Sequence, residues 1–169
     1  ELLLADVSRR SRRGTLIDTF RNRVIFPIVD LRGNVIGFGG RVLDDSQPKY
    51  LNTAQTPVFD KGKNLFSLQF AKNSVTTTLI LAEGYMDVIA VHQAGFENVV
   101  ATLGTAITPD QARKISQYAK TVMIAYDSDA AGQAATQKAM RHFSEVGIET
   151  KILRMQGAKD PDEYIRKFG

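Results

Sequence analysis

The second half of the chain repeats one pattern, in which a short and continuous apolar run is followed by a segment with helical spacing. Strands are expected at 78–82, 98–101, 121–126 and 149–154, and helices at 85–95, 109–120, 130–146 and 161–168. Strands without polar alternation are typical of sheets that helices cover on both faces. The strand and helix repeat predicts a parallel sheet. The feature therefore restricts this part of the chain to the α/β class.

Several of the expected helices have clear end signals. Thr108, Pro109 and Gln111 provide the capping threonine, the first-turn proline and the reciprocal glutamine of a capping box. Gly147 supplies a stop after the helix at 130–146. Gly84 follows the strand at 78–82 directly, and we expect it to let the backbone turn sharply there.

The first part of the chain has a different pattern. Two β-rich segments, 24–30 and 35–42, are joined by a short turn sequence and predict a hairpin. The glycines of the second segment predict a bulge or the close approach of a ligand to the backbone. The arginine-rich stretch 8–14 is expected as a mobile basic loop, and 44–64 as mostly turn and loop. We thus expect a partial, basic, β-rich α+β subdomain over 1–73, followed by the α/β domain over 74–169.

Composition excludes several classes of function. With 169 residues of which 43% are hydrophobic, the chain can build one sizeable core with a smaller appended subdomain. The absence of cysteine removes disulfides, thiol catalysis and cysteine-bound zinc, and two isolated histidines cannot form a zinc site alone. No apolar stretch reaches the roughly 20 residues that span a bilayer, and the first residues lack the basic lead of a signal peptide. We expect a cytoplasmic protein in which any metal is bound by oxygen.

Charge is distributed unevenly along the chain. Residues 1–63 carry 11 Lys and Arg against 7 Asp and Glu, whereas residues 64–169 carry 11 of each, so that the net charge of +4 lies wholly in the first part. A basic part that precedes a balanced one suits a polyanion held by the first while the second acts on it. An ordinary solvated basic face remains the alternative reading.

Acidic side chains gather where expected strands end, in the clusters Glu83 to Asp87, Asp127 to Asp129 and Asp160 to Asp162. Open α/β sheets bind ligands at the carboxyl ends of their strands. Several carboxylates in one crevice repel one another unless cations lie between them, and hard oxygen ligands select Mg²⁺ or Mn²⁺. Metal-assisted phosphoryl chemistry is therefore the leading hypothesis.

Each carboxylate also has a structural interpretation. Asp129 and Asp160 stand where helices begin, so both are candidates for N-caps. Asp87 lies one turn into a helix, where it would complement the helix dipole or support the metal ligands from behind. Glu83 would point into the crevice as a metal ligand, or as a general acid or base.

Four motifs, taken in this order and spacing, resemble the TOPRIM domain of bacterial DnaG-type primases: Glu83-Gly84-Tyr85-Met86-Asp87, Thr102-Leu103-Gly104-Thr105, the run from Tyr126 to Gly132, and Asp160-Pro161-Asp162. The upstream segments 20–28, 37–41, 48–52 and 61–62 resemble the basic subdomain that precedes TOPRIM in those primases. TOPRIM carboxylates alone also occur in topoisomerases and some nucleases. The upstream segments make the resemblance specific to primase.

The resemblance implies a template-directed RNA polymerase that makes short RNA primers on single-stranded DNA from ribonucleoside triphosphates during replication. It implies two-metal nucleotidyl transfer with Mg²⁺ or Mn²⁺ and catalytic roles for Glu83, Asp127 and Asp129. The residues expected around the metals are Glu83, Asp127, Asp129, Asp160 and Asp162, with Asp87 beside them. The residues expected to hold nucleic acid or nucleotide are Arg21, Arg23, Arg41, Lys49, Tyr50 and Lys61.

The same resemblance sets expectations about partners. A full-length primase of this kind acts at the replication fork in the bacterial cytoplasm and reaches the replicative helicase through a C-terminal region that this sequence does not contain. The zinc-binding module that precedes this region in the family is not in the sequence either, so we expect an excised catalytic core, monomeric and without zinc.

Other functions are compatible with the same residues. A non-catalytic TOPRIM module could hold one structural ion and grip single-stranded nucleic acid with its basic part. A nuclease or topoisomerase-like enzyme would use the same carboxylates. A phosphohydrolase or receiver-type domain would use Asp127 as a phosphorylated nucleophile, but the carboxylates here outnumber the lysine and hydroxyl partners that such a site needs.

Overall fold

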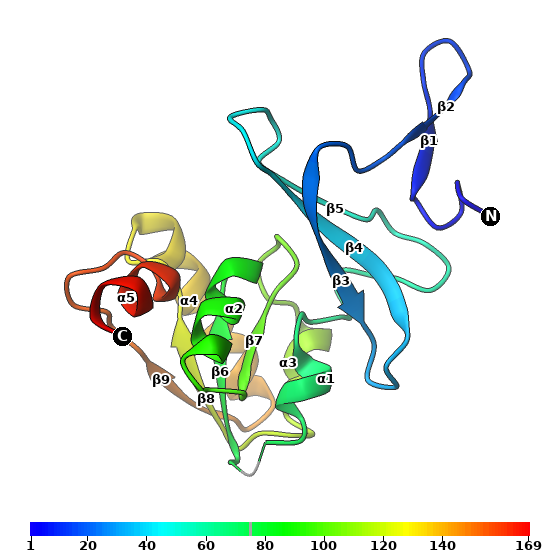
Figure 1. Cartoon of the computed structure of the whole chain (residues 1–169). Helices are drawn as coiled ribbons and strands as arrows, with labels where there is room; N and C mark the ends of the chain where they lie inside the picture. Colours follow the sequence, from blue (N-terminus) through cyan, green and yellow to red (C-terminus); the bar gives the residue numbers. More distant parts are fainter. Residues whose placement is uncertain (75) are drawn as a thin grey trace. The chain divides into compact units, whose positions relative to one another are not determined.

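The computed structural model describes residues 1–74 and 76–169 and divides into two compact units, Glu1–Lys61 and Gly62–Gly169 (Figure 1). Residues 62–73 belong to the second unit by their contacts, and the limits of 1–73 and 74–169 stay a prediction about domains. Within the described part of the chain, no helix has the length and apolar character needed to cross a membrane.

The second unit is built on a four-stranded sheet. Its strands are β6 (Thr78–Ala82), β7 (Val99–Ala101), β8 (Thr121–Ala125) and β9 (Glu149–Ile152). They lie in the order β7-β6-β8-β9, and every neighbouring pair is parallel. The α/β fold predicted from the apolar runs is confirmed, and β6 and β8 are the two central strands.

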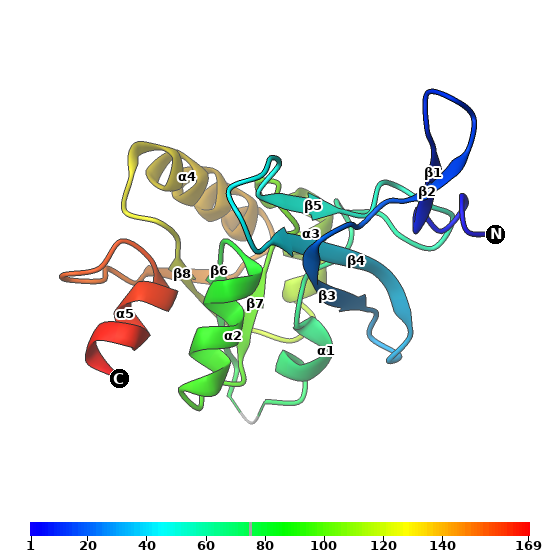
Figure 2. The same cartoon turned by 45° about the horizontal axis from the view of Figure 1, so that its top comes forward.

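Helices cover both faces of this sheet, as predicted. They are α1 (Leu68–Ala71), α2 (Tyr85–Gln93), α3 (Pro109–Ile115), α4 (Ala130–Glu145) and α5 (Pro161–Phe168). The helices α2 and α5 pack together on one face, and α3 and α4 lie on the other (Figures 1 and 2). Each face buries its own apolar layer, with Val88 and Val91 of α2 on the first and Ile115 and Phe143 on the second.

The start of α3 and the end of α4 before Gly147 follow their sequence signals. The capping box at α3 forms as expected, since the Thr108 hydroxyl accepts from the Gln111 amide at 3.1 Å and the Gln111 side chain accepts from the Thr108 amide at 3.0 Å. The turn expected at Gly84 is present, since Glu83 and Gly84 form a bend between β6 and α2, but the backbone conformation of Gly84 does not require glycine. Its φ of −142° and ψ of 177° describe extended backbone that any residue adopts, and an added Cβ would meet nothing closer than 3.6 Å.

The first unit consists of two antiparallel sheets. One joins β3 (Arg23–Val29), β4 (Val35–Val42) and β5 (Tyr50–Asn52), and the other pairs β1 (Ser8–Arg10) with β2 (Leu16–Asp18). The predicted hairpin is confirmed. Of the loop expected at 8–14, residues 11–14 do form a turn, whereas Ser8–Arg10 form β1 and pair in register with β2. The short β5 lies within the stretch expected as turn and loop.

The glycines of β4 serve the packing of this unit itself. A Cβ on Gly40 would approach Phe20 at 2.9 Å and Arg23 at 3.0 Å, and one on Gly37 would approach Phe59 at 3.3 Å. The register of this sheet shifts between Ile28 and Val29 of β3, which pair with Gly37 and Val35, so the extra residue lies on β4 directly before Gly37 and the expected bulge is confirmed. The groups that come close to the glycine backbone are therefore aromatic and arginine side chains of the same unit.

Candidate active site

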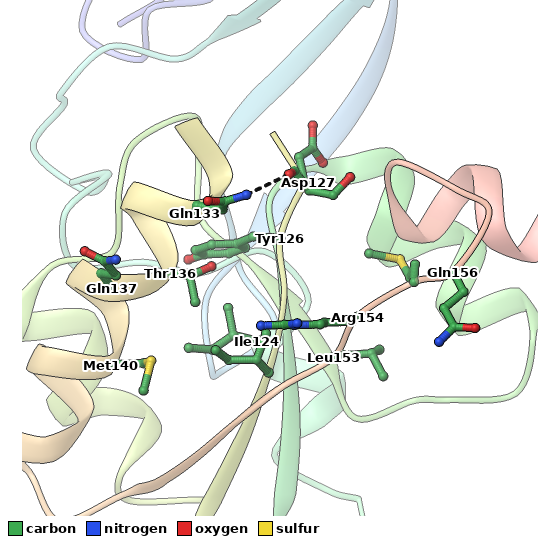
Figure 3. A pocket seen from close by; sticks show the side chains of 13 residues that line it. Ile124, Tyr126, Asp127, Gln133, Thr136, Gln137, Met140, Leu153, Arg154 and Gln156 are labelled. Carbon is green, nitrogen blue, oxygen red and sulfur yellow. Dashed lines mark hydrogen bonds between the residues drawn. The ribbon is translucent and has the colours of Figure 1, made fainter. Parts of the chain in front are cut away.

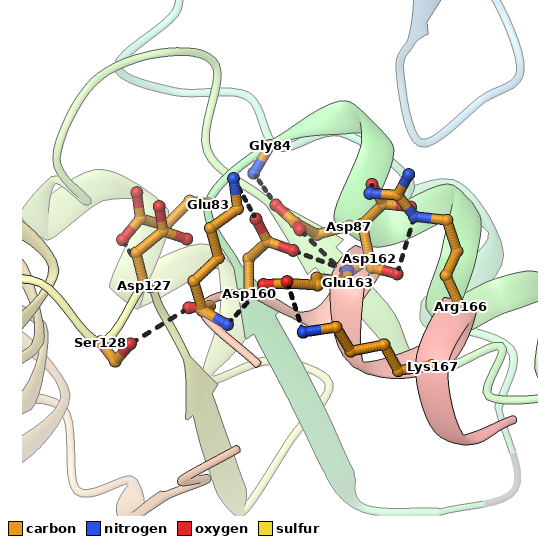
Figure 4. A network of polar contacts seen from close by, with 11 residues as sticks. Glu83, Gly84, Asp87, Asp127, Ser128, Asp160, Asp162, Glu163, Arg166 and Lys167 are labelled. Atoms are coloured by element: carbon orange, nitrogen blue, oxygen red, sulfur yellow. Dashed lines mark hydrogen bonds and ion pairs between the residues drawn. The ribbon is translucent and has the colours of Figure 1, made fainter. Parts of the chain in front are cut away.

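Two of the predicted carboxylates meet at the carboxyl ends of the central strands. Glu83 follows β6 and Asp127 follows β8 after one residue, and both side chains are half-buried. The Glu83 Oε1 atom accepts a hydrogen bond from the Asp127 amide at 3.0 Å (Figure 4). Burial raises the pKa of Glu83, and the charges of Asp127 and Asp129 raise it further. The two central strands therefore bring these two acidic residues together.

Asp129 occupies the N-cap of α4. Its Oδ1 atom accepts from the Gly132 amide at 2.8 Å, so the capping interpretation is correct for this residue. A capping carboxylate uses one oxygen and keeps the other available. Burial raises the pKa of Asp127, and the charges of Asp160 and Asp129 raise it further. Asp129 therefore caps the helix, and its charge also raises the pKa of Glu83 and of Asp127.

Gly132 is a site residue that sequence reasoning missed. A Cβ at this position would lie 2.1 Å from the Asp127 carbonyl oxygen and 3.1 Å from the Glu83 Oε1 atom. Backbone this close leaves no room for any side chain. The signal was present in the sequence, because a glycine in the first turn of a helix lowers helix stability and needs a local reason.

The third acidic cluster opens α5. Asp160 is its N-cap and accepts from the Glu163 amide at 2.7 Å, and Asp162 pairs with Arg166 at 2.7 Å (Figure 4). The side chains of Asp160 and Asp162 are only 17% and 21% exposed, so both are largely withdrawn from water. Asp160 thus fulfils its capping interpretation while it still raises the pKa of Asp127.

Asp87 links the first cluster to the third. Its Oδ2 atom accepts from the Gly84 amide at 3.2 Å, and its Oδ1 atom accepts from the Asp162 amide at 3.4 Å, which joins α2 to the start of α5. Burial, followed by the charges of Asp160 and Asp127, raises the pKa of Asp87 from its ordinary 3.8 to about 7. The surface interpretation of Asp87 is therefore wrong, and its position behind the cluster agrees with a supporting role.

Lys159 is the second missed residue. Its carbonyl accepts from the Ser128 amide at 3.2 Å, which ties the loop after β8 to the loop before α5. Its Nζ atom lies 3.7 Å from the Asp160 Oδ2 atom, and its charge lowers the pKa of Asp127. A lysine directly before an Asp-Pro helix opening was the available signal. Lys159 and Arg166 together partly compensate the negative charge of Asp160 and Asp162.

The donor set fits a hard divalent cation by its chemistry. It consists only of carboxylate oxygens, it is partly withdrawn from water, and the charges of its members raise one another's pKa. In residues 1–74 and 76–169, however, no three acidic or histidine side chains converge closely enough to hold an ion in their present rotamers. The local hydrogen bonds of Glu83, Asp129 and Asp160 explain this, because each carboxylate is turned toward a neighbouring amide.

The predicted basic residues lie in the first unit, and Arg23 and Arg41 make structural contacts there. Arg23 donates to the carbonyls of Gly40 and Lys49, both at 3.3 Å, and so holds the strand edge together. The Arg41 guanidinium lies 6.0 Å from the ring centre of Tyr50, opposite it in the register of β4 and β5. Lys49 is exposed beside them.

Two further residues predicted to bind nucleic acid lie at other places in the first unit. Arg21 is exposed just before β3, and Lys61 is the last residue of the unit. Among the six predicted basic and aromatic residues, the structure therefore brings together Arg23, Arg41, Lys49 and Tyr50 around β4 and β5.

Replacing Asp87 with asparagine should change how stability depends on pH. Because the folded-state pKa of Asp87 is raised, the folded protein holds its proton more tightly than the unfolded chain. That stabilising contribution is complete below pH 3.8 and is lost as the pH rises through about 7. In EDTA at pH 8, Asp87→Asn should be more stable than the parent by about 2 kcal/mol in urea unfolding.

Asp110 offers a control for that experiment, because it is an exposed carboxylate in the first turn of α3. Asp110→Asn should bring no such gain in the free energy of unfolding at pH 8. An Asp87→Asn variant that shows the same pH dependence as the parent between pH 4 and 8 would contradict the assigned burial of this carboxylate.

Comparison with known proteins identifies the family. Residues 80–165 match the family model described as Toprim-like, and residues 1–72 match the model for the N-terminal domain of the DNA primase catalytic core. The chain belongs to the Toprim-like family, and within it to the catalytic cores of bacterial DnaG-type DNA primases. This agrees with the resemblance predicted from the acidic motifs and the upstream basic segments.

Individual relatives agree with this assignment. The chain is 57% identical over 153 residues to a DNA primase of Clostridium acetobutylicum, covering 90% of this chain and 26% of the relative. A DNA primase of Halalkalibacterium halodurans is 45% identical over 162 residues, with 95% of this chain and 27% of the relative covered. The chain therefore spans about a quarter of the length of the curated relatives that it matches.

Solved structures with the same fold include primases. The Aquifex aeolicus primase, comprising zinc-binding and RNA polymerase domains, superposes with a TM-score of 0.92 at 41% identity over 99% of this chain and 42% of its own. A DnaG primase catalytic domain bound to single-stranded DNA gives a TM-score of 0.91 at 39% identity, over 99% of this chain and 56% of its own. Both units of the chain have counterparts in these structures.

Proposed function

We propose that this chain is the catalytic region of a bacterial DNA primase, which joins ribonucleoside triphosphates into short RNA primers on a single-stranded DNA template. The observation that carries the proposal is the meeting of Glu83 and Asp127 at the ends of the two central strands, with Asp160 close enough to raise the pKa of Asp127. Family membership supplies the reaction. A primase that carries this chain would act at the replication fork in the bacterial cytoplasm.

The carboxylates would hold Mg²⁺ or Mn²⁺. We assign the ligands to Glu83, Asp127, Asp129, Asp160 and Asp162, with catalytic roles for the first three and a positioning role for Asp87. Bound divalent ions would activate the primer 3′-hydroxyl and stabilise the leaving pyrophosphate. Rotation of the Glu83, Asp129 and Asp160 carboxylates away from the amides that they accept from would turn their oxygens into the crevice.

The first unit would hold the single-stranded DNA or the nucleotide. Arg41 of β4 pairs with Tyr50 of β5, Lys49 directly precedes β5, and Tyr50 is 38% exposed, so that its ring could stack on a base. Arg21 and Lys61 are assigned to the same function from the family resemblance alone, and Arg23 would act mainly by holding β4 against β5. Domain limits near 1–73 and 74–169 belong to the same proposal. Contact with the replicative helicase would require the rest of the primase.

Exchange of the metal tests the proposed reaction. A full-length primase that carries this region should make primers on single-stranded DNA with Mg²⁺ or Mn²⁺, and lose turnover when Ca²⁺ replaces them, while DNA binding persists. Equal behaviour with Mg²⁺ and Ca²⁺, with binding but no primers in either, would favour a non-catalytic binding module. Cleavage of the template instead of primer synthesis would favour the nuclease alternative.

The salt dependence of DNA binding tests the basic residues. Each phosphate contact releases counterions, and its loss lowers the slope of log affinity against log salt by about 0.7 for a single strand. Arg41→Gln with Lys49→Gln should therefore weaken single-stranded DNA binding and lower that slope by about 1.4. Lys138→Gln, an exposed change on α4, is the control. An unaltered slope in the double variant would show that neither residue contacts the DNA phosphates.

A further inference from the structure

A cavity of about 590 Å³ lies beside the carboxylates, between α4 and the chain that leaves β9 (Figure 3). It lies wholly within the second unit, and none of the proposed basic residues lines it. Its volume is within the roughly 300–1,000 Å³ of small-ligand sites. Asp127 lines the cavity and also belongs to the proposed metal centre, so the two sites share one residue.

The cavity contains a buried hydroxyl without a partner. Tyr126 is only 7% exposed, and among the described residues its hydroxyl has no hydrogen-bond partner. Buried phenols ordinarily find a partner, because an unpaired hydroxyl lowers stability. Gln137 and Met140 line the same cavity from α4, and both side chains are exposed.

The remaining lining combines hydrogen-bonding groups with apolar surface. Figure 3 shows the Arg154 side chain reaching across the cavity toward Ile124, and within the described part of the chain no ion pair or hydrogen bond is formed by its guanidinium. Gln133 donates from Nε2 to the Ser128 carbonyl at 3.2 Å, which leaves its amide oxygen to accept. Leu153 and Met155 add apolar surface.

This combination selects the class of ligand. A single unpaired cation is too little positive charge for a polyphosphate. Amide groups and a phenol offer donors and acceptors together, which suits the edge of a heterocyclic base, and aliphatic, thioether and guanidinium groups suit its faces. We propose that the cavity accepts the nucleobase of a nucleotide whose phosphates extend toward Asp127. The inference rests on the proposed function, which places nucleotide phosphates at the neighbouring carboxylates.

NMR spectra of the methionine methyl groups, recorded on the intact chain, test this proposal directly. Met140 and Met155 line the cavity, whereas Met123 packs against the core on the opposite side of the sheet and serves as an internal control. With ¹³C-methyl methionine, titration of AMP in the presence of Mg²⁺ should shift the Met140 and Met155 signals by ring current and leave Met123 unchanged. Ribose 5-phosphate should produce no such shift, because it carries the phosphate without the base.

Substitutions distinguish a binding role of the Tyr126 hydroxyl from a general loss of stability. Tyr126→Phe removes only the unpaired hydroxyl, so it should weaken AMP binding about fivefold while the melting temperature without ligand stays equal or rises. Arg154→Gln should weaken binding by a similar factor. Lys151→Gln, an exposed change on β9 outside the cavity lining, should leave AMP affinity unchanged.

Three outcomes would overturn the inference: no methyl shift at millimolar AMP, equal shifts with AMP and ribose 5-phosphate, or unchanged affinity in Tyr126→Phe. A parallel Mn²⁺ titration distinguishes the two proposals. Mn²⁺ binding at the carboxylates without a base-dependent shift would reject the base pocket and leave the primase proposal standing. Base-dependent shifts without Mn²⁺ binding would instead remove the metal centre and keep a base-binding site.

Discussion

Replacing Gly132 with alanine is expected to destabilise the second unit by about 3 kcal/mol and to disrupt the junction of Glu83 with Asp127. The added Cβ would lie 2.1 Å from the Asp127 carbonyl oxygen, a backbone atom that cannot move without displacing the end of β8. It would also lie 3.1 Å from Glu83 Oε1, the atom that accepts from the Asp127 amide. Urea unfolding in EDTA measures the loss of stability.

Gly84 provides the matched control, since it stands at the start of α2 near the same cluster. Its backbone is extended, and an added Cβ would meet only Asp87 Oδ2, at 3.6 Å. Gly84→Ala should therefore cost at most about 1 kcal/mol, the difference between glycine and alanine at an N-cap. If Gly132→Ala were as mild as Gly84→Ala, the close packing of α4 on the Asp127 loop would be wrong.

Replacing Asp127 and Asp129 together with asparagine is expected to lower Mn²⁺ affinity at least about 100-fold, because changes even to groups behind metal ligands cost 10–100-fold. Primer synthesis by a full-length primase that carries the two changes should fall with it. The fold should survive in EDTA, since burial and neighbouring charges already disfavour the ionised form of Asp127. Calorimetric titration of Mn²⁺ measures the loss of binding, and thermal unfolding without metal checks the fold.

Asp110→Asn is the matched control, because it removes an exposed carboxylate at the start of α3 that pairs with Arg113. It should leave Mn²⁺ affinity unchanged. A double variant of Asp127 and Asp129 that binds Mn²⁺ as the parent does would remove these residues from the metal centre. A double variant that no longer folds in EDTA would show that the carboxylates serve the fold rather than a metal.

The parallel sheet could be predicted from sequence because its signals are local. Continuous apolar runs identified β6 and β8, and a capping box located the start of α3 at Pro109. The expected helix at 109–120 ends at Ile115 instead, since the residues that follow form turns before β8. Helix ends depend on contacts that the pattern of one segment does not contain.

The hairpin of β1 and β2 was missed for a related reason. Its strands are three residues each and carry arginine and polar side chains, so neither shows the apolar alternation that marks a strand. Pairing across the turn decides the structure there. The glycines of β4 predicted the bulge beside Gly37, but not the partner in the close approach, because a ligand and a neighbouring side chain such as Phe20 leave the same signal in the sequence.

The acidic cluster could be predicted as a set, but its internal contacts could not. Strand ends bring Glu83 and Asp127 to one edge of the sheet, which topology alone implies. The burial of Asp87 depends on α5 packing against α2, a contact between helices far apart in the sequence. Lys159 and Gly132 act through backbone atoms, and these leave only weak signals in the sequence.

Diffraction from crystals grown with Mn²⁺ and a non-hydrolysable ribonucleoside triphosphate tests the central claim most directly, because the anomalous signal locates the ion. The account predicts a Mn²⁺ ion bound by oxygens of Glu83 and Asp127, with Asp129 or the carboxylates at the start of α5 completing the site and the triphosphate in contact with the metal. Crystals that hold the triphosphate but show no anomalous peak within bonding distance of any of these carboxylates would contradict it.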